Sequence, residues 1–574
     1  MTTILERSEI EERICRGQAI VIYDGNVLRL DKWIKYHPGG DKAIHHMIGR
    51  DATDEMKAYH CDETVSTFLK WRIGRVSGRW HNFLPPIQGG VFKSREDQEG
   101  SGPSCEPESE WRDVDTSDAF QDISKTKRMC GEPDVKIYPK IPQGVVPTLD
   151  LKLAFEKKVV TDPQDITENY DNEQVKHDLL TLPSLDAETQ DWLSQEYNEM
   201  HQEVIQAGLY KCNYFRYAKE LLRIGALFGL SYFLLFHKNQ KFWSAVSMGA
   251  AWQQLVFIAH DAGHIGITHN YQADNIIGMV IASWIGGLSL GWWKRNHNVH
   301  HLVTNDPIHD PDIQHLPFFA VSTRLFNNIY STYYERFLWF DKFAQKVIPL
   351  QRFLYYPILA FGRFNLYRLS WMHVLLGQGP RRGKAAWFRY FELAGLIFFN
   401  YWFFYLIVIC RLHTGWERFQ YIMVSHITTM LVHVQITLSH FAMSTSDLGV
   451  AEGFPMRQLR TSMDVDCPRW LDFLHGGLQF QVVHHLFPRL PRHNLRDAQP
   501  FVIKFCEKVG LTYSIYGFKK GNGVVLGRLE EIAQQAKTML KCAQTMEQEA
   551  NSRPKPNISA PIDHTCSSKR HKLA

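Results

Sequence analysis

Residues 297–301 read His-Asn-Val-His-His, and related patterns occur at residues 260–264 (His-Asp-Ala-Gly-His) and 481–485 (Gln-Val-Val-His-His). Residues three and four apart lie on one face of a helix, so each cluster can aim several imidazoles at one point. Neutral imidazole is a good ligand for iron, copper, nickel and zinc. We therefore interpret the three clusters as a candidate metal site.

Strongly apolar segments surround the three clusters, at residues 221–236, 241–259, 274–293, 391–410 and 419–439. A membrane-spanning helix needs about 20 predominantly apolar residues, and each segment is near that length. Short connections join the first segment to the second and the fourth to the fifth, which predicts two helical hairpins. Imidazoles at the ends of such segments are costly to bury, and this indicates a function for them.

The segment 274–293 decides whether the clusters can meet. A full membrane crossing would carry the second cluster to the side opposite the first. A common metal site therefore predicts that this segment lies in the membrane interface or turns back. Its glycines permit such a turn, namely Gly278, Gly286, Gly287 and Gly291.

A second pair of histidines lies near the N-terminus. The sequence His37-Pro-Gly-Gly is followed, 23 residues after its histidine, by His60. Two imidazoles on opposite sides of a pocket can fill both axial positions of a heme iron, which suits transfer of single electrons. His45 and His46 are alternatives, but they lie too close to His37 in the sequence to fit the far side of a heme well.

Composition divides the chain into four regions. Residues 5–77 have short β-like runs around a turn at 24–26 and then helical patterns, as in a small α+β domain. Residues 78–150 are rich in Gly, Pro, Ser, Asp and Glu, which predicts a flexible acidic linker. Residues 151–540 hold the apolar segments, and residues 545–574 are predicted to be a disordered tail.

The whole-chain composition excludes other classes. The formal net charge is +4, so no strong basic field favours nucleic acid as a partner. Ten cysteines are scattered without a Cys-x-x-Cys pair, so we expect neither a disulfide framework nor a zinc site.

On these motifs, residues 5–77 resemble cytochrome b5. Most of residues 195–525 is similar to the membrane fatty-acyl and sphingolipid desaturases of the cytochrome b5-fusion, front-end group, in which Gln opens the third cluster. The resemblance implies a multidomain protein. An α+β heme domain would accompany an α-helical integral membrane desaturase domain, with about four transmembrane helices in two hairpins and a cytosolic helical cap.

The resemblance also implies the cofactors and their ligands. Heme b would be bound axially by His37 and His60. A di-iron centre would be held by His260, His264, His297, His300, His301, His440, His484 and His485. Gln481 is a possible further ligand or an outer partner. Candidates to orient the imidazoles, or else simple turn and capping residues, are Asp261, Asn305, Asp306 and Asp312. No catalytic residue beyond the metal ligands is implied.

The implied reaction is O2-dependent desaturation of a lipid chain. General acid–base chemistry cannot remove hydrogens from an unactivated methylene, so a metal cofactor must supply the oxidant. No Gly-x-Gly-x-x-Gly motif follows a predicted strand, so NADH is expected to act through a separate cytochrome b5 reductase. A multi-pass protein of the endoplasmic reticulum is implied, with the heme domain and all histidine clusters facing the cytosol.

The long acidic linker resembles that of the Δ8 sphingolipid desaturases, which act on the long-chain base of ceramide or glucosylceramide. Three alternatives stay open at this stage. They are a Δ6-type acyl-lipid desaturase, a lipid hydroxylase and a membrane-anchored heme electron carrier.

Overall fold

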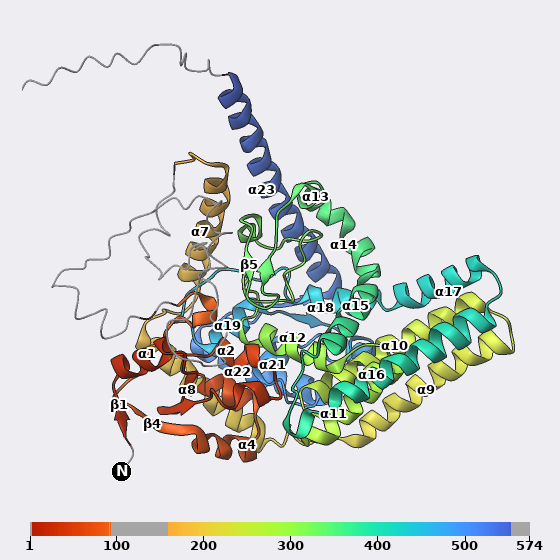
Figure 1. The fold of residues 1–574 in the computed structure, drawn as a ribbon, viewed down its shortest axis with the longest axis horizontal. Coiled ribbons are helices and arrows are strands. Elements are labelled where there is room, and N and C mark those ends of the chain that lie inside the picture. The colour runs from red at the N-terminus through yellow and green to blue at the C-terminus, as the bar shows by residue number, and fades with distance from the viewer. Residues whose placement is uncertain (1–2, 91, 93–158, 553–574) are drawn as a thin grey trace, which may run out of the picture.

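The computed structural model describes residues 3–90, 92 and 159–552. Figure 1 shows an N-terminal α+β domain in red at the lower left, an elongated helical arm that extends to the right, and a helical cap above the N-terminal domain. Most of the predicted linker and the end of the predicted tail lie outside the described residues.

The N-terminal domain is built on one small sheet with the strand order β1-β4-β3-β2. Strands β2 and β3 form an antiparallel hairpin. Asp24 and Gly25, at its turn, have positive φ angles of 48° and 67°, as a tight two-residue turn requires. The domain's elements are β1 (Ile4–Leu5), α1 (Arg7–Cys15), β2 (Ile20–Tyr23), β3 (Asn26–Arg29), α2 (Asp41–His45), α3 (Thr53–Tyr59), α4 (Asp62–Thr67) and β4 (Arg72–Val76).

The packed N-terminal unit extends beyond the boundary that we expected at residue 77. The Trp80 indole donates a hydrogen bond to the Gly49 carbonyl over 3.2 Å, and the Phe83 amide donates to the same carbonyl over 2.9 Å. Both rings pack against the hydrophobic core of the domain. The composition of this short stretch is polar on average, and its two aromatic residues override that average because they bury apolar surface.

The arm consists of antiparallel helices. They are α9 (Tyr214–Phe236), α10 (Lys241–Gly263), α16 (Phe388–Phe399) with its π-helical continuation Asn400–Arg411, and α17 (Gly415–Thr428). Helix α10 packs between α9 and α17, and at Gly249 a β-carbon would lie 2.3 Å from the Ser425 carbonyl oxygen. Such close approach of two backbones is typical of membrane helices with small residues at their interface.

Two helices in the described residues are long and apolar enough to cross a membrane, Gly383–Arg411 and Gly415–Leu438. A bent pair, Tyr271–Ile285 with Leu290–Leu302, raises the number to three if it counts as one span. The four spans that we expected are therefore not all supported. Neither helix of the first hairpin is among the candidate spans: Arg216, Lys219 and Glu220 occupy the first turns of α9, and α10 contains the polar residues Gln253, Gln254 and Asp261.

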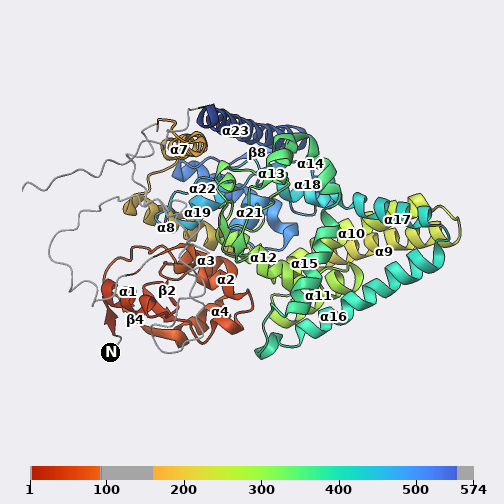
Figure 2. The same ribbon diagram turned by 45° about the horizontal axis from the view of Figure 1, so that its top comes forward.

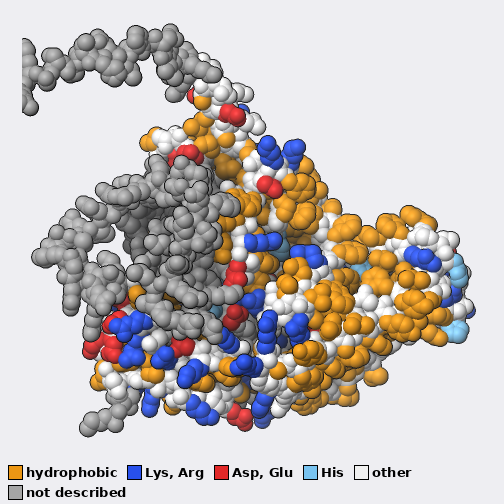
Figure 3. All heavy atoms as spheres, in the orientation of Figure 1, with side chains coloured by type: hydrophobic (Ala, Val, Ile, Leu, Met, Phe, Trp, Pro, Cys, Tyr) orange, Lys and Arg blue, Asp and Glu red, His pale blue; other side chains and the backbone are white. Residues whose placement is uncertain are grey.

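The surface of the arm is nevertheless apolar. Figure 3 shows hydrophobic side chains covering the visible face of α9, α16 and α17. Leu222 on α9 has an exposed fraction of 75%, and Tyr390 on α16 of 68%. A contiguous apolar surface of this kind marks contact with lipid or with another protein.

The segment 274–293 turns back, as a shared metal site requires. Helix α11 (Tyr271–Met279) continues as a π-helical stretch, Val280–Ile285, and then meets α12 (Leu290–Leu302) at an angle of 117°. Gly287, at the bend, has a φ of 72°, and a β-carbon there would lie 2.3 Å from the Phe399 ring. A glycine is thus required at this turn.

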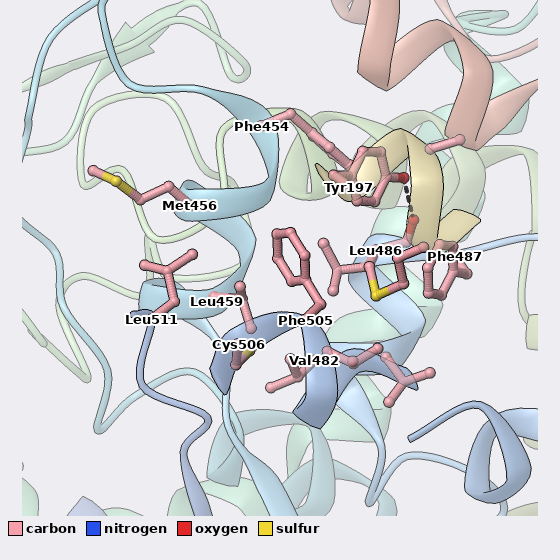
Figure 4. Close-up of a cluster of buried hydrophobic side chains, with 14 of the residues drawn as sticks. Tyr197, Phe454, Met456, Leu459, Val482, Leu486, Phe487, Phe505, Cys506 and Leu511 are labelled. Atoms are coloured by element: carbon pink, nitrogen blue, oxygen red, sulfur yellow. Dashed lines mark hydrogen bonds between the residues drawn. The ribbon is translucent and has the colours of Figure 1, made fainter. Parts of the chain in front are cut away.

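The cap joins segments that are far apart in the sequence. Its core brings together α8, α19, α21 and α22 (Figures 2 and 4). Tyr197 donates a hydrogen bond to the Leu486 carbonyl over 2.8 Å and so fixes the end of α21, as Figure 4 shows. The cap helices are α7 (Pro163–Thr181), α8 (Ala187–Gln206), α19 (Phe454–Thr461), α20 (Asp472–His475), α21 (Gln481–Leu486), α22 (Leu495–Val509) and α23 (Phe518–Ser552). Helix α18 (Met430–Leu438) continues α17 and ends the candidate span Gly415–Leu438.

The remaining elements connect the arm to the cap. They are α13 (Lys342–Val347), α14 (Gln351–Ala360), α15 (Gly362–Leu376) and the short strand pairs β5 (Tyr330–Ser331) with β6 (Arg336–Phe337) and β7 (Asp464–Asp466) with β8 (Ile515–Gly517). Helix α23 continues to Ser552, so the predicted disordered tail from residue 545 was wrong at its start. Buried residues along α23, such as Leu529 and Ile532, anchor the helix to the cap.

Candidate metal centres

The two N-terminal histidines face each other across a narrow gap. Their ring centroids lie 6.2 Å apart. Two metal–nitrogen bonds of about 2 Å each, with half a ring beyond each nitrogen, account for a separation of this size. His46, one of the alternatives, instead makes a 2.9 Å hydrogen bond with Gln88, and His37 and His60 remain the pair that can bind a heme from both sides.

Backbone carbonyls set the tautomer of both rings. His37 Nδ1 lies 2.8 Å from the Gly40 oxygen, and His60 Nδ1 lies 2.9 Å from the Met56 oxygen. With Nδ1–H donated in this way, each Nε2 carries the free lone pair that a metal needs. Burial, together with the neighbouring His37, lowers the pKa of His60 to about 4, so its ring is neutral at pH 7.

All eight histidines proposed as iron ligands come together between α10, α12, α18 and α21. Ligand atoms within 4.8 Å of one another define two histidine groups. The first group consists of His260, His264, His297 and His484. The second group consists of His300, His440 and His485. The groups therefore do not coincide with the sequence clusters. The second cluster contributes His297 to the first group and His300 to the second, and the third cluster contributes His484 and His485 in the same way.

His301 lies between the two groups. Its ring stacks on that of His485 at 4.1 Å, and it lies 4.9 Å from that of His264. Its Nε2 is 3.0 Å from His297 Nε2, so the two nitrogens are directed toward one region. The side chain is fully buried, as expected for a residue shared by both groups.

Several of the grouped nitrogens are buried without a partner. Among the described residues, no hydrogen-bond partner is present for Nε2 of His260, His264, His484 and His485. A buried polar atom without a partner is costly, and native proteins satisfy nearly all of them. Metal ions in the two groups would use these lone pairs, so the donor set fits a dinuclear site with imidazole ligands.

Acidic and amide side chains hold the outer nitrogens of these rings. His300 Nδ1 lies 2.8 Å from Asp310 Oδ2, and His485 Nδ1 lies 2.8 Å from Gln458 Oε1. Neither Asp310 nor Gln458 was singled out in the sequence. The Asp310 partnership could have been noticed, because the residue lies ten positions after His300 in an acidic loop, but Gln458 has no such signal.

The four polar residues proposed as orienting partners differ in their contacts. Asp312 Oδ2 is 3.5 Å from His297 Nδ1, and Asn305 donates to the His440 carbonyl over 2.8 Å. Asp261 lies 3.7 Å from His260 Nδ1, and it also accepts a 2.9 Å hydrogen bond from Arg492. Asp306 accepts from the Ile308 and His309 amides and is a turn residue.

Gln481 begins α21 and is buried, one turn before His484 and His485. Its role stays a prediction. Trp293, which the sequence analysis did not single out, stacks on His297 with ring centroids 4.5 Å apart. Its ring also lies 5.2 Å from that of His260, so it covers one side of the first group.

Comparison with known proteins finds a matching family model for each of two regions of the chain. The family model for a cytochrome b5-like heme/steroid binding domain matches residues 6–77, and the fatty acid desaturase model matches residues 240–517. The chain is 78% identical to the Delta 8-(E)-sphingolipid desaturase of Lachancea kluyveri, over 96% of this chain and 97% of the relative.

Other relatives span both substrate classes. Identity is 60% to the Delta 8-(E)-sphingolipid desaturase of Candida albicans, over 94% of this chain and 97% of the relative. An acyl-lipid (9-3)-desaturase of Borago officinalis is 36% identical, over 61% of this chain and 77% of the relative. The sphingolipid relatives thus match nearly the full length, whereas the acyl-lipid relative matches less of the chain.

Proposed function

Because this chain belongs to the fatty acid desaturase family, in the group with a fused cytochrome b5 domain, we propose that it is a sphingolipid Δ8 desaturase. The observation that carries this proposal is the 78% identity over nearly the full length of a Delta 8-(E)-sphingolipid desaturase. The product would be a trans double bond at carbon 8 of the long-chain base of a ceramide or glucosylceramide.

The two histidine groups support a dinuclear iron site, with His301 between them. When bound, such a site supplies the O2-derived oxidant that removes hydrogens from an unactivated chain. Asp310 and Gln458 keep a proton on the Nδ1 atoms of His300 and His485, which leaves Nε2 of each ring for the metal. Trp293 excludes water from one side of the first group.

The N-terminal domain would hold heme b between His37 and His60. Electrons would come from NADH through a separate cytochrome b5 reductase. The acidic segment that follows the domain would tether it to the desaturase, which raises its local concentration there. The heme domain and both histidine groups would face the cytosol.

For the membrane, we propose that the arm and α18 provide four spans in two hairpins, with α11 and the bend before α12 as a re-entrant element. The apolar surface of the arm supports this arrangement (Figure 3). Basic side chains gather where the arm meets the cap in the same view, as expected for the cytosolic side of the endoplasmic reticulum membrane.

Mass spectrometry of sphingoid bases and fatty-acid esters from cells that express the chain tests the proposal. Double bonds would be located by derivatisation, with His484→Ala as the inactive control. We expect new unsaturation at carbon 8 of the long-chain base, absent in the control. New double bonds only in acyl chains would contradict the sphingolipid substrate, and a gain of one oxygen instead would identify a hydroxylase.

The heme electron carrier is distinguished by metal content. Two non-heme irons per heme would agree with the proposed desaturase. A purified protein with heme and without non-heme iron would contradict it.

A further inference from the structure

Helix α12 forms a wall between the N-terminal heme domain and the histidine groups. On one face, Asn298 Nδ2 donates to the Gly39 carbonyl over 3.0 Å, and Arg295 pairs with Asp41 over 3.4 Å. Leu302 packs against the core of the heme domain. Positions 295, 298 and 302 are spaced by three and four residues, so they share one side of the helix.

The same helix carries His297, His300 and His301 on its opposite side. Asn298 contacts the His37-Pro-Gly-Gly turn directly, since Gly39 lies two residues after His37. The heme domain therefore docks with one of its ligand-bearing turns against the helix that bears three of the proposed iron ligands.

Tyr59 lies between His60 and the histidine groups. It is bonded through the backbone to His60, and its ring lies edge-on to that of His301, with centroids 5.9 Å apart. The ring packs against the cap core, where Ala58 is also buried. Among the described residues its buried hydroxyl has no hydrogen-bond partner, so the side chain is held there by its ring and not by a polar contact.

We propose that the Tyr59 ring is the contact through which the heme domain passes single electrons to the histidine groups, and that Asn298 holds the two parts in register. Electron transfer weakens steeply with each gap through space. A route of covalent bonds from His60 to Tyr59, followed by one ring-to-ring contact with His301, has a single gap of this kind. The inference rests on the proposed function, because it takes the two histidine sets as heme and iron ligands.

The step balances as a one-electron exchange. The ferrous heme is oxidised to the ferric state, and one ferric non-heme iron is reduced to the ferrous state, with no bond made or broken. Two such transfers serve each double bond, and the NADH-dependent reductase returns the heme to the ferrous state.

The test follows heme re-oxidation in the full-length holoprotein. Without O2 or lipid substrate, a light-driven electron donor reduces the heme in a short pulse while the non-heme iron is ferric, and the heme absorbance then reports its re-oxidation by that iron. We expect Tyr59→Leu to slow re-oxidation by at least about tenfold, a barrier increase of about 1.4 kcal/mol. Tyr59→Phe keeps the ring and should stay near the wild-type rate.

A matched variant separates electron passage from docking. Asn198 donates to Asp54 over 2.8 Å and so joins the two parts of the chain away from α12. If Asn198→Ala slowed re-oxidation as much as Tyr59→Leu, Tyr59 would act only through docking and the proposal would fail. It would fail equally if Tyr59→Leu kept the wild-type rate, or if Tyr59→Phe were as slow as Tyr59→Leu.

Further readouts exclude damage to either metal site. The heme spectrum, the heme midpoint potential and the non-heme iron content of Tyr59→Leu should match the wild type. A small diffusible mediator that bypasses the heme should restore turnover in Tyr59→Leu and not in His484→Ala. Because the rate of heme re-oxidation is compared between variants, a wild-type protein that makes no Δ8 product would contradict the proposed substrate and leave the electron route testable.

Discussion

His300 and Asp310 form a buried pair in which the imidazole Nδ1 donates to a carboxylate oxygen over 2.8 Å. Asp310 has an exposed fraction of 0% and also accepts hydrogen bonds from the Asn305 and Asp312 amides. The carboxylate thus orients a proposed iron ligand and closes the loop that follows α12.

We expect Asp310→Asn to lower iron affinity by about 10- to 100-fold, the usual cost of losing an orienting partner of a metal-bound histidine. The measurement is non-heme iron per heme after dialysis against graded chelator. Asp306→Asn is the control, because Asp306 caps a turn without contacting the grouped histidines. Equal iron loss in both variants would indicate a general loop defect.

Gln458 is expected to support both groups at once. It accepts from His485 Nδ1 over 2.8 Å and donates to the His301 carbonyl over 2.8 Å. Gln458→Leu removes both contacts and leaves a buried imidazole N–H unpaired, at a cost of about 1–3 kcal/mol. Desaturase turnover and iron content should both fall, and Gln458→Glu, which keeps the acceptor, should recover more of each. Turnover and iron content at the wild-type level in Gln458→Leu would contradict this role.

Removal of a heme ligand should abolish heme binding and leave the non-heme iron bound. His60→Ala is expected to abolish the heme absorbance and NADH-driven desaturation while non-heme iron stays bound, because His60 lies outside both histidine groups. His46→Ala should keep the heme, since His46 is bonded to Gln88 and does not face His37. Heme loss in His46→Ala, with heme kept in His60→Ala, would reverse the assignment.

Asp464 makes stability depend on pH. Its side chain is fully buried beside the start of α21, where its Oδ1 accepts a hydrogen bond from the Val482 amide over 2.8 Å. Burial raises its pKa to about 7 in the folded protein. A raised carboxyl pKa favours folding while the group is protonated, so this contribution is present below about pH 4 and is lost as the pH rises through about 7.

Thermal unfolding between pH 5 and 8 would measure this effect. We expect the wild type to lose stability across this range, and Asp464→Asn, which cannot ionise, to lose less. The difference is limited to a few kcal/mol, because each pKa unit corresponds to about 1.4 kcal/mol. Parallel curves for the two proteins would show that Asp464 does not titrate in this range.

Much of the site was accessible from the sequence, because ligand spacing on a helix is a local property. Histidines three and four residues apart share a helix face whatever the rest of the chain does. The pair His37 and His60 was equally accessible, because the glycine-rich turn and the spacing together point to a heme. Apolar length predicted the two candidate spans of the second hairpin, whereas the first hairpin is not among the candidate spans, and α9 begins with charged residues that shorten its apolar run.

The sequence by itself therefore determined which imidazoles are candidates to bind metal. Only the tertiary structure decided how these imidazoles are divided between the two histidine groups. Adjacent residues on a helix project about 100° apart, so His484 and His485 enter different groups once α21 meets the histidines of α10, α12 and the end of α18. The partners Asp310 and Gln458, and the approach of Tyr59 to His301, depend on contacts between distant segments, which local patterns do not encode.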